Sequence, residues 1–169
     1  CAQCRYHAIH DTVACRGAVI PPATTAWKPR CALYTVACLR SAKGAALARS
    51  WGVLYVAGGG STGGTALYAH LRVDVDAPHE AVASRLYGWP DRGIATAMVT
   101  KAGARLAVAS LHLPLDALAR QRYSTMVGQL LDQYPTTHRL VAGDLNEKPG
   151  GPTWQGLHDG GLCDLDPAC

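Results

Sequence analysis

Two stretches decide the fold of this chain: SLHL at residues 110–113 and VAGDLNE at residues 141–147. Each is a run of small and apolar residues that ends in polar side chains. This pattern is typical of a buried strand that delivers its last residues to the edge of a sheet. The first strand would deliver His112. The second would deliver Asp144 and Asn146, which are two residues apart and therefore on one side of an extended chain.

One predicted helix joins these two strands. Residues 114–116 open it with Asp116 as the N-cap, and Tyr134-Pro135 ends it. Its buried face is predicted to comprise Leu118, Ala119, Met126, Leu130 and Leu131. A strand–helix–strand crossover makes the strands parallel and brings their ends to the same edge of the sheet. We therefore expect the polar strand ends to converge on one cleft.

A histidine beside a carboxylate and an amide is a set suited to phosphate ester hydrolysis. The carboxylate can hold a metal or orient water, the amide can donate to a phosphoryl oxygen, and the imidazole can move a proton. Taken singly, each residue has a plainer explanation. His112 would be a hydrogen-bonded core histidine, and Asp144-Leu145-Asn146 would be a turn.

The other predicted elements indicate an α+β, or mixed α/β, fold class. Residues 94–99 and 105–111 form two strands, and Gly103 between them suits a tight hairpin. Further strands are predicted at residues 53–57, 65–69, 71–75 and 139–142, and a short helix at residues 153–157.

Residues 1–50 differ from the rest of the chain. They carry seven Lys and Arg against one acid, Asp11, and five of the seven cysteines. Residues 51–169 carry nine Lys and Arg against eleven acids. Apart from an alanine-rich stretch at 37–50 that favours a helix, the first fifty residues show no period. We therefore expect a basic, Cys-rich and poorly ordered segment at 1–50, followed by one domain at 51–169.

Composition also sets expectations about the compartment. The 49% hydrophobic content argues against disorder, and no apolar run approaches the ~20 residues of a membrane span. The odd number of cysteines prevents a complete set of internal disulfides, and no secretory signal segment is visible. These features favour reduced thiols and the cytoplasm. The start at Cys1 indicates a processed or incomplete chain.

The order of motifs resembles that of the endonuclease/exonuclease/phosphatase superfamily, the deoxyribonuclease I-like metal-dependent phosphoesterases. The resemblance covers about residues 51–164. Its motifs are residues 109–113, Arg120, residues 141–147, Pro149, Trp154 and residues 161–164, with weaker matches upstream at residues 64–67 and 91–93.

The resemblance implies part of a four-layer αββα sandwich and hydrolysis of a phosphodiester or phosphomonoester by metal-activated water. It gives His112 a hydrogen bond or proton transfer at the scissile phosphate. It gives Asp144 the orientation of the water or the binding of Mg²⁺ or Mn²⁺, with support from Asn146. Arg92 would contact the substrate phosphate, unless it is a surface arginine at the sheet edge. The substrate would be a phosphoester, with nucleic acid and phosphoinositides among the candidates.

Two parts of the family pattern are missing. The family carries an Asn on its first strand and a metal-binding Glu on the next, yet Asp11 is the only acid before Asp74 and no Asn precedes Asn146. The family's final Ser-Asp-His strand is also not seen. The sequence therefore indicates an incomplete or inactive member, with a replaced or frame-shifted N-terminus.

Two other functions stay open. The chain would be a non-enzymatic fragment whose basic arm binds a partner, or binds zinc through Cys1, Cys4, His7, His10 and Cys15. Alternatively, the GxGxxG pattern in residues 58–64 would bind a dinucleotide at a helix N-terminus. The helix that must follow this glycine loop would be short.

Overall fold

The computed structural model describes residues 6–9, 14–15, 33–37, 48–49, 52–58, 65–83 and 92–163, with the backbone alone at 6–9, 14–15, 33–37 and 83. None of the described helices is long and apolar enough to cross a membrane. The elements are β1 (Tyr6–Ile9), β2 (Ala14–Cys15), β3 (Leu33–Ala37), β4 (Leu54–Gly58), β5 (Thr65–Ala69), β6 (Asp74–Ala83), β7 (Arg92–Lys101), β8 (Ala104–His112), α2 (Ala117–Leu131), β9 (Arg139–Asp144) and α3 (Pro152–Asp159).

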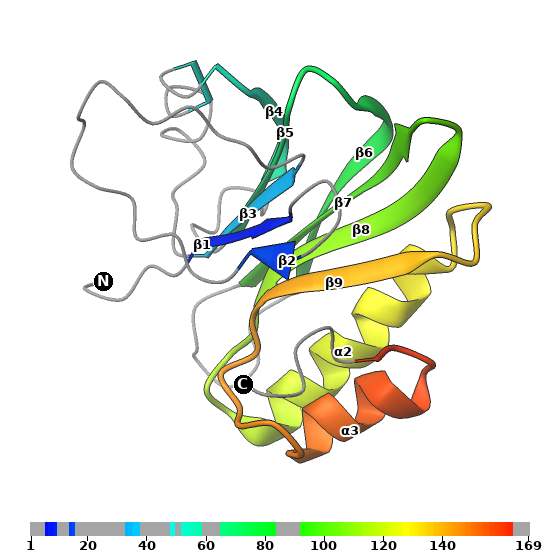
Figure 1. The fold of residues 1–169 in the computed structure, drawn as a ribbon. Coiled ribbons are helices and arrows are strands. Elements are labelled where there is room, and N and C mark those ends of the chain that lie inside the picture. Colours follow the sequence, from blue (N-terminus) through cyan, green and yellow to red (C-terminus); the bar gives the residue numbers. More distant parts are fainter. Residues whose placement is uncertain are drawn as a thin grey trace.

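Two sheets pack against each other, and two helices cover the outer face of one of them (Figure 1). The strand orders are β2-β1-β3-β5-β4 and β6-β7-β8-β9. Leu67 and Val108 belong to the apolar cluster between the sheets, whereas Leu111 and Val127 belong to the cluster between the second sheet and α2. The α+β class and the partial sandwich are thereby confirmed, with sheet, sheet and helices as successive layers.

The parallel crossover is confirmed. β8 and β9 pair in parallel, with α2 between them in the chain. Asp116 caps α2, because its side chain accepts the backbone N–H of Ala119 at 2.8 Å. The predicted face was wrong in one position, since Leu118 is 50% exposed. Leu118 precedes the buried row, which consists of Ala119, Tyr123, Val127, Leu130 and Leu131.

The hairpin between β7 and β8 is also confirmed. Lys101 pairs with Ala104, and the two residues between them, Ala102 and Gly103, have φ of 49° and 82°. Positive φ at both central positions is the type I′ turn that matches the twist of the flanking strands. The glycine that suggested a turn therefore occupies a position that favours it.

The strand predicted at 71–75 was misplaced. Leu71 is 75% exposed, and β6 runs on from Asp74 to Ala83. A bulge between Asp76 and His79, with Ala77 at φ 46°, interrupts the alternation that a sequence pattern would use. The hydroxyl of Tyr134 donates to the carbonyl of Ala77 at 2.9 Å and holds this bulge.

The first fifty residues contribute strands that no periodicity indicated. β3 pairs antiparallel with β5, from Leu33 opposite Ala69 to Ala37 opposite Thr65. The sequences of β1, β2 and β3, which are YHAI, AC and LYTVA, show no strict alternation of apolar and polar residues. The proposed zinc ligands and most of the predicted helix at 37–50 lie outside the residues whose side chains are described. The division at residue 50 stays a prediction.

The glycine loop does not lead into a helix. Gly58 is the last residue of β4, and residues 59–64 lie outside the described part. The next element, β5, pairs antiparallel with β4. A dinucleotide-binding loop requires a helix at this point, so the structure does not support that hypothesis.

Gly143 is required where β9 approaches β8. Its φ is 146°, and a Cβ atom there would lie 1.9 Å from the carbonyl oxygen of Leu111. No ordinary side chain fits that distance, and the backbone conformation itself favours glycine. Gly143 therefore permits the pairing that carries Asp144 to the sheet edge.

Replacement of this glycine gives the first test. We expect Gly143→Ala to lower the free energy of unfolding by roughly 1–3 kcal/mol, because the new Cβ meets backbone and the φ is strained. The matched control is Gly128→Ala in α2, where a Cβ meets nothing within 4 Å. That variant should gain about 0.4–1 kcal/mol. Urea unfolding measures both changes, and equal stability of the two variants would contradict the expectation.

Candidate active site

His112 and Asp144 end two neighbouring strands and face each other at one edge of the sheet. They are register partners, and the backbone N–H of Leu113 donates to the carbonyl of Asp144 at 2.8 Å. The Nε2 atom of His112 lies 3.9 Å from Oδ2 of Asp144. The imidazole is buried, whereas the carboxylate is 30% exposed. The expected convergence of the two strand ends is therefore present.

The alternation of β8 decides which way His112 points. Leu111 packs beneath α2, and Val108 packs between the sheets. Because side chains alternate along a strand, His112 shares the inter-sheet face with Val108 and Ser110. The hydroxyl of Ser110 is buried and lies 2.7 Å from the hydroxyl of Thr65 on β5. This contact between Ser110 on β8 and Thr65 on β5 therefore joins the two sheets near His112.

Asn146 forms a turn and braces the site. Its backbone N–H donates to Oδ1 of Asp144 at 2.8 Å, and its φ is 50°. Its side-chain Nδ2 donates to the carbonyl of Leu113 at 2.5 Å. The Asp-x-Asn sequence is thus a turn that also joins the two strand ends. A contact between Asn146 and phosphate stays a prediction.

Arg92 reaches the same edge from the start of β7. Because β7 runs antiparallel to β8, its first residue lies beside the end of β8. The Nη1 atom of Arg92 lies 3.3 Å from Nδ1 of His112, and its backbone N–H donates to the hydroxyl of Tyr123 at 3.3 Å. Its Nε is buried without a hydrogen-bond partner among the described residues. Arg92 thus places a cation against the imidazole, rather than standing alone at the surface.

The described residues do not form a metal site by themselves. They include no group of three or more His, Cys, Asp or Glu side chains that could hold a metal ion. Mg²⁺ requires six oxygen ligands, and Asp144 is the one carboxylate that the described structure places against His112. The Mg²⁺ or Mn²⁺ site that the resemblance implies, at Asp144 with Asn146, stays a prediction.

Two other described carboxylates, those of Glu80 and Glu147, bind partners other than His112 and Asp144. Glu80 on β6 accepts the backbone N–H of Gly58 at 2.6 Å and the hydroxyl of Tyr55 at 3.4 Å. Burial, together with the charge of Glu80, raises the pKa of Tyr55 to about 12. Glu80 therefore ties β6 to β4.

The second of these carboxylates belongs to Glu147, whose structural role was not predicted from the sequence. Its Oε1 lies 3.3 Å from Nη2 of Arg120, and its Oε2 accepts the backbone N–H groups of Thr153 and Trp154 at 2.8 and 2.9 Å. Burial alone would raise its pKa, but these hydrogen bonds and the arginine lower it. The one signal was Gly150-Gly151 before Pro152, the first residue of α3, because Gly151 leaves room for the side chain of Glu147.

Glu147 gives the protein a specific dependence on acid. A carboxyl whose pKa is lowered by folding stabilises the fold above its unfolded pKa, about 4.3, and this contribution is lost as the pH falls through the folded pKa. We expect Glu147→Gln to flatten the loss of stability below about pH 4.3. Urea unfolding in pH steps tests this, with exposed Asp159→Asn as the control. Identical pH slopes for wild type and Glu147→Gln would refute it.

Arg92 also fixes the proton on His112. A guanidinium only donates hydrogen bonds, so Nδ1 of His112 must accept, and the neutral imidazole carries its proton on Nε2, toward Asp144. We expect long-range ¹H–¹⁵N correlation spectra at pH 8 to show an unprotonated Nδ1, and Arg92→Met to weaken this preference. A protonated Nδ1 in the wild type would contradict the assignment.

No protein-family model matches this chain, and no curated protein matches its sequence. Solved structures do match its fold. An endonuclease/exonuclease/phosphatase family protein from Bacteroides thetaiotaomicron gives a TM-score of 0.66 at 13% identity, over 77% of this chain and 55% of that chain. The mannosyl-6-phosphatase Bt3783 of the same species gives 0.63 at 14% identity, over 73% and 54%.

A third match is TDP2 of D. rerio complexed with a single-strand DNA product, with a TM-score of 0.54 at 17% identity, over 73% of this chain and 50% of that chain. The chain thus spans about half the length of these proteins. The resemblance seen in the sequence is confirmed for the fold: the described part of the chain has the architecture of the endonuclease/exonuclease/phosphatase proteins.

Proposed function

We propose that the protein is a phosphoesterase that hydrolyses phosphodiester or phosphomonoester bonds. The observation that carries the proposal is the meeting of Arg92, His112 and Asp144 at one sheet edge, with 3.3 Å and 3.9 Å between successive side chains. A cation, an N–H donor and a carboxylate in that order suit a phosphate and the water that attacks it. Mg²⁺ or Mn²⁺ enters as the cofactor that the resemblance implies.

Each side chain has a definite task in this proposal. Arg92 is a permanently charged donor, and its planar guanidinium matches phosphate oxygens. His112 donates a hydrogen bond from Nε2 to a phosphoryl oxygen as charge develops there. Asp144, which is partly exposed, accepts a hydrogen bond from the attacking water and orients it. The water oxygen bonds to phosphorus as the ester bond to the leaving group breaks. Asp144 takes the proton that the water loses, and the leaving oxygen takes a proton from solvent.

The substrate class is a phosphoester. The matched structures include a mannosyl-6-phosphatase and a protein bound to a DNA product. Both a phosphorylated small molecule and a nucleic acid strand are therefore candidates for this chain. A non-enzymatic fragment is the second candidate, and the incomplete ligand set around Asp144 in the described residues favours it.

One assay separates these two candidates. It measures Mg²⁺- and Mn²⁺-dependent cleavage of plasmid DNA and of bis-p-nitrophenyl phosphate, with EDTA as the negative control. We expect His112→Ala and Asp144→Asn each to lower kcat/KM by roughly 10²- to 10⁴-fold, since each removes a group that acts on the phosphoryl oxygen or on the water. Exposed Asp159→Asn should leave the rate unchanged.

Two results would decide against the catalytic assignment. Metal-stimulated turnover that persists in both His112→Ala and Asp144→Asn would exclude these residues as the catalytic pair. A folded wild type without turnover on any phosphoester would favour the non-enzymatic fragment.

A further inference from the structure

The two loops that follow the candidate catalytic residues leave different strands, and one side chain joins them. Residues 113–116 follow His112, and residues 145–147 follow Asp144. Arg120 lies in the first turns of α2. Its Nη1 donates to the carbonyl of Leu115 in the first loop, and its Nη2 pairs with Glu147 in the second at 3.3 Å.

Glu147 also forms hydrogen bonds through its second carboxylate oxygen. Its second oxygen accepts two backbone N–H groups at the start of α3. Gly151 leaves space for it, because a Cβ there would lie 2.4 Å from Cδ of Glu147. The Arg120 and Glu147 side chains are only 12% and 8% exposed. A buried pair of this kind is costly to break and has little freedom to move.

The parallel pairing of β8 and β9 places the backbones of His112 and Asp144 opposite each other, and the two loops begin directly after these residues. Two hydrogen bonds join the strand ends directly in the described part of the chain. The backbone N–H of Leu113 donates to the carbonyl of Asp144, and Nδ2 of Asn146 donates to the carbonyl of Leu113. The Arg120–Glu147 ion pair adds a contact farther along both loops. Arg120 belongs to α2, and Glu147 bonds to the start of α3, so this contact also attaches the loops to two helices. We propose that Arg120 and Glu147 are positioning residues, which set the His112–Asp144 geometry required for hydrolysis. This inference rests on the proposed phosphoesterase function.

A positioning role predicts a specific kinetic pattern. We expect Arg120→Met and Glu147→Gln each to lower kcat by roughly 10- to 100-fold with KM changed less than about 2-fold, because a small displacement of catalytic groups affects the transition state most. If the residues act as one unit, the double variant should lose no more than the worse single variant.

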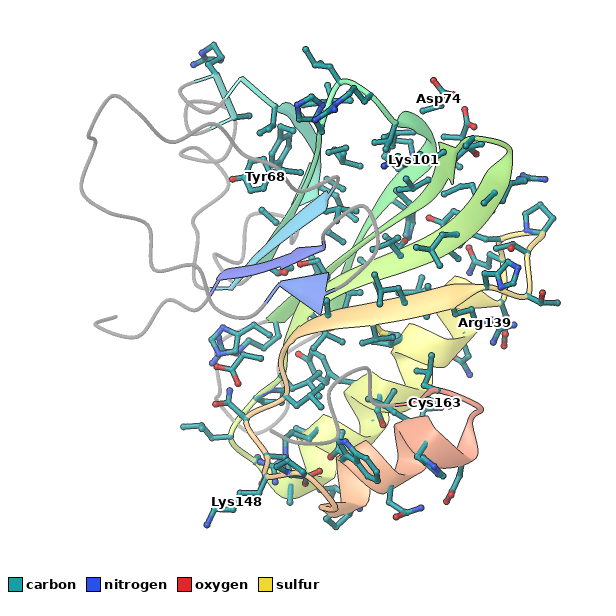
Figure 2. All side chains as sticks on the ribbon, in the orientation of Figure 1. Tyr68, Asp74, Lys101, Arg139, Lys148 and Cys163 are labelled. Carbon is teal, nitrogen blue, oxygen red and sulfur yellow. The ribbon has the colours of Figure 1, made fainter. Side chains whose placement is uncertain are left out.

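A second ion pair supplies the matched control. Arg139 and Asp132 lie 2.7 Å apart and also join β9 to α2, but at the start of the strand. Figure 2 shows Arg139 far from Lys148, the residue that follows the loop at 145–147. Arg139→Met and Asp132→Asn should therefore leave kcat and KM as in the wild type.

The decisive readout does not require turnover. At a temperature where circular dichroism shows every variant folded, the ring ¹⁵N resonances of His112 should shift in Arg120→Met and Glu147→Gln, and stay in place in Asp132→Asn. If Arg120→Met does not fold, Arg120→Lys, which lacks the two-armed guanidinium, takes its place with the same expectation.

The outcomes separate the inference from the proposed function. If the wild type shows no turnover, the phosphoesterase proposal fails and the His112 resonances alone decide the positioning role. If the Arg120 and Glu147 variants only lose thermal stability, with kcat and the His112 resonances as in the wild type, the pair is a structural tie and the inference is overturned.

Discussion

β8 and β9 run in parallel register from Ala107 opposite Arg139 to His112 opposite Asp144, and the meeting of His112 with Asp144 depends on that pairing. Parallel neighbours need a long crossover, which places α2 over the outer face of the sheet. The same register brings both polar strand ends to one level. Gly143 permits the close approach, because its missing side chain leaves room for the carbonyl of Leu111.

The groups that end the strands also stabilise the site. Where β8 and β9 end, backbone N–H and C=O groups need partners outside the strand pairing. Here the N–H of Leu113 bonds to Asp144, and its C=O accepts the amide of Asn146. Both backbone groups of Leu113 are therefore satisfied within the site, while Oδ2 of Asp144 and Nε2 of His112 lie 3.9 Å apart. The contacts that complete the backbone thus also present the side chains that would act on a substrate.

The sequence predicted what depends on local pattern. The strands at residues 53–57, 65–69, 94–99, 105–111 and 139–142 follow from sequence patterns of a few residues, as does the hairpin at Gly103. The helical pattern between His112 and Asp144 likewise predicted the crossover. The course of β6 depends on a bulge held by Tyr134, far along the chain, and no local pattern contains it. The role of Glu147 depends on Arg120 and on the start of α3, which meet only in the folded chain.

The formal charges of Arg92 and Asp144 cancel, so the hydrogen-bond donors at the site, rather than its net charge, suit it to a phosphate. Arg92 and His112 supply donors, and Asp144 is the single carboxylate that the described residues place with them. Carboxylates are not scarce nearby in the chain, but Glu147 is neutralised by Arg120 and by a helix start. We expect a phosphate to bind there through hydrogen bonds from Arg92 and His112. If the Mg²⁺ or Mn²⁺ that the resemblance implies were bound, Asp144 would be the described carboxylate that holds it, and substrate oxygens would supply further ligands.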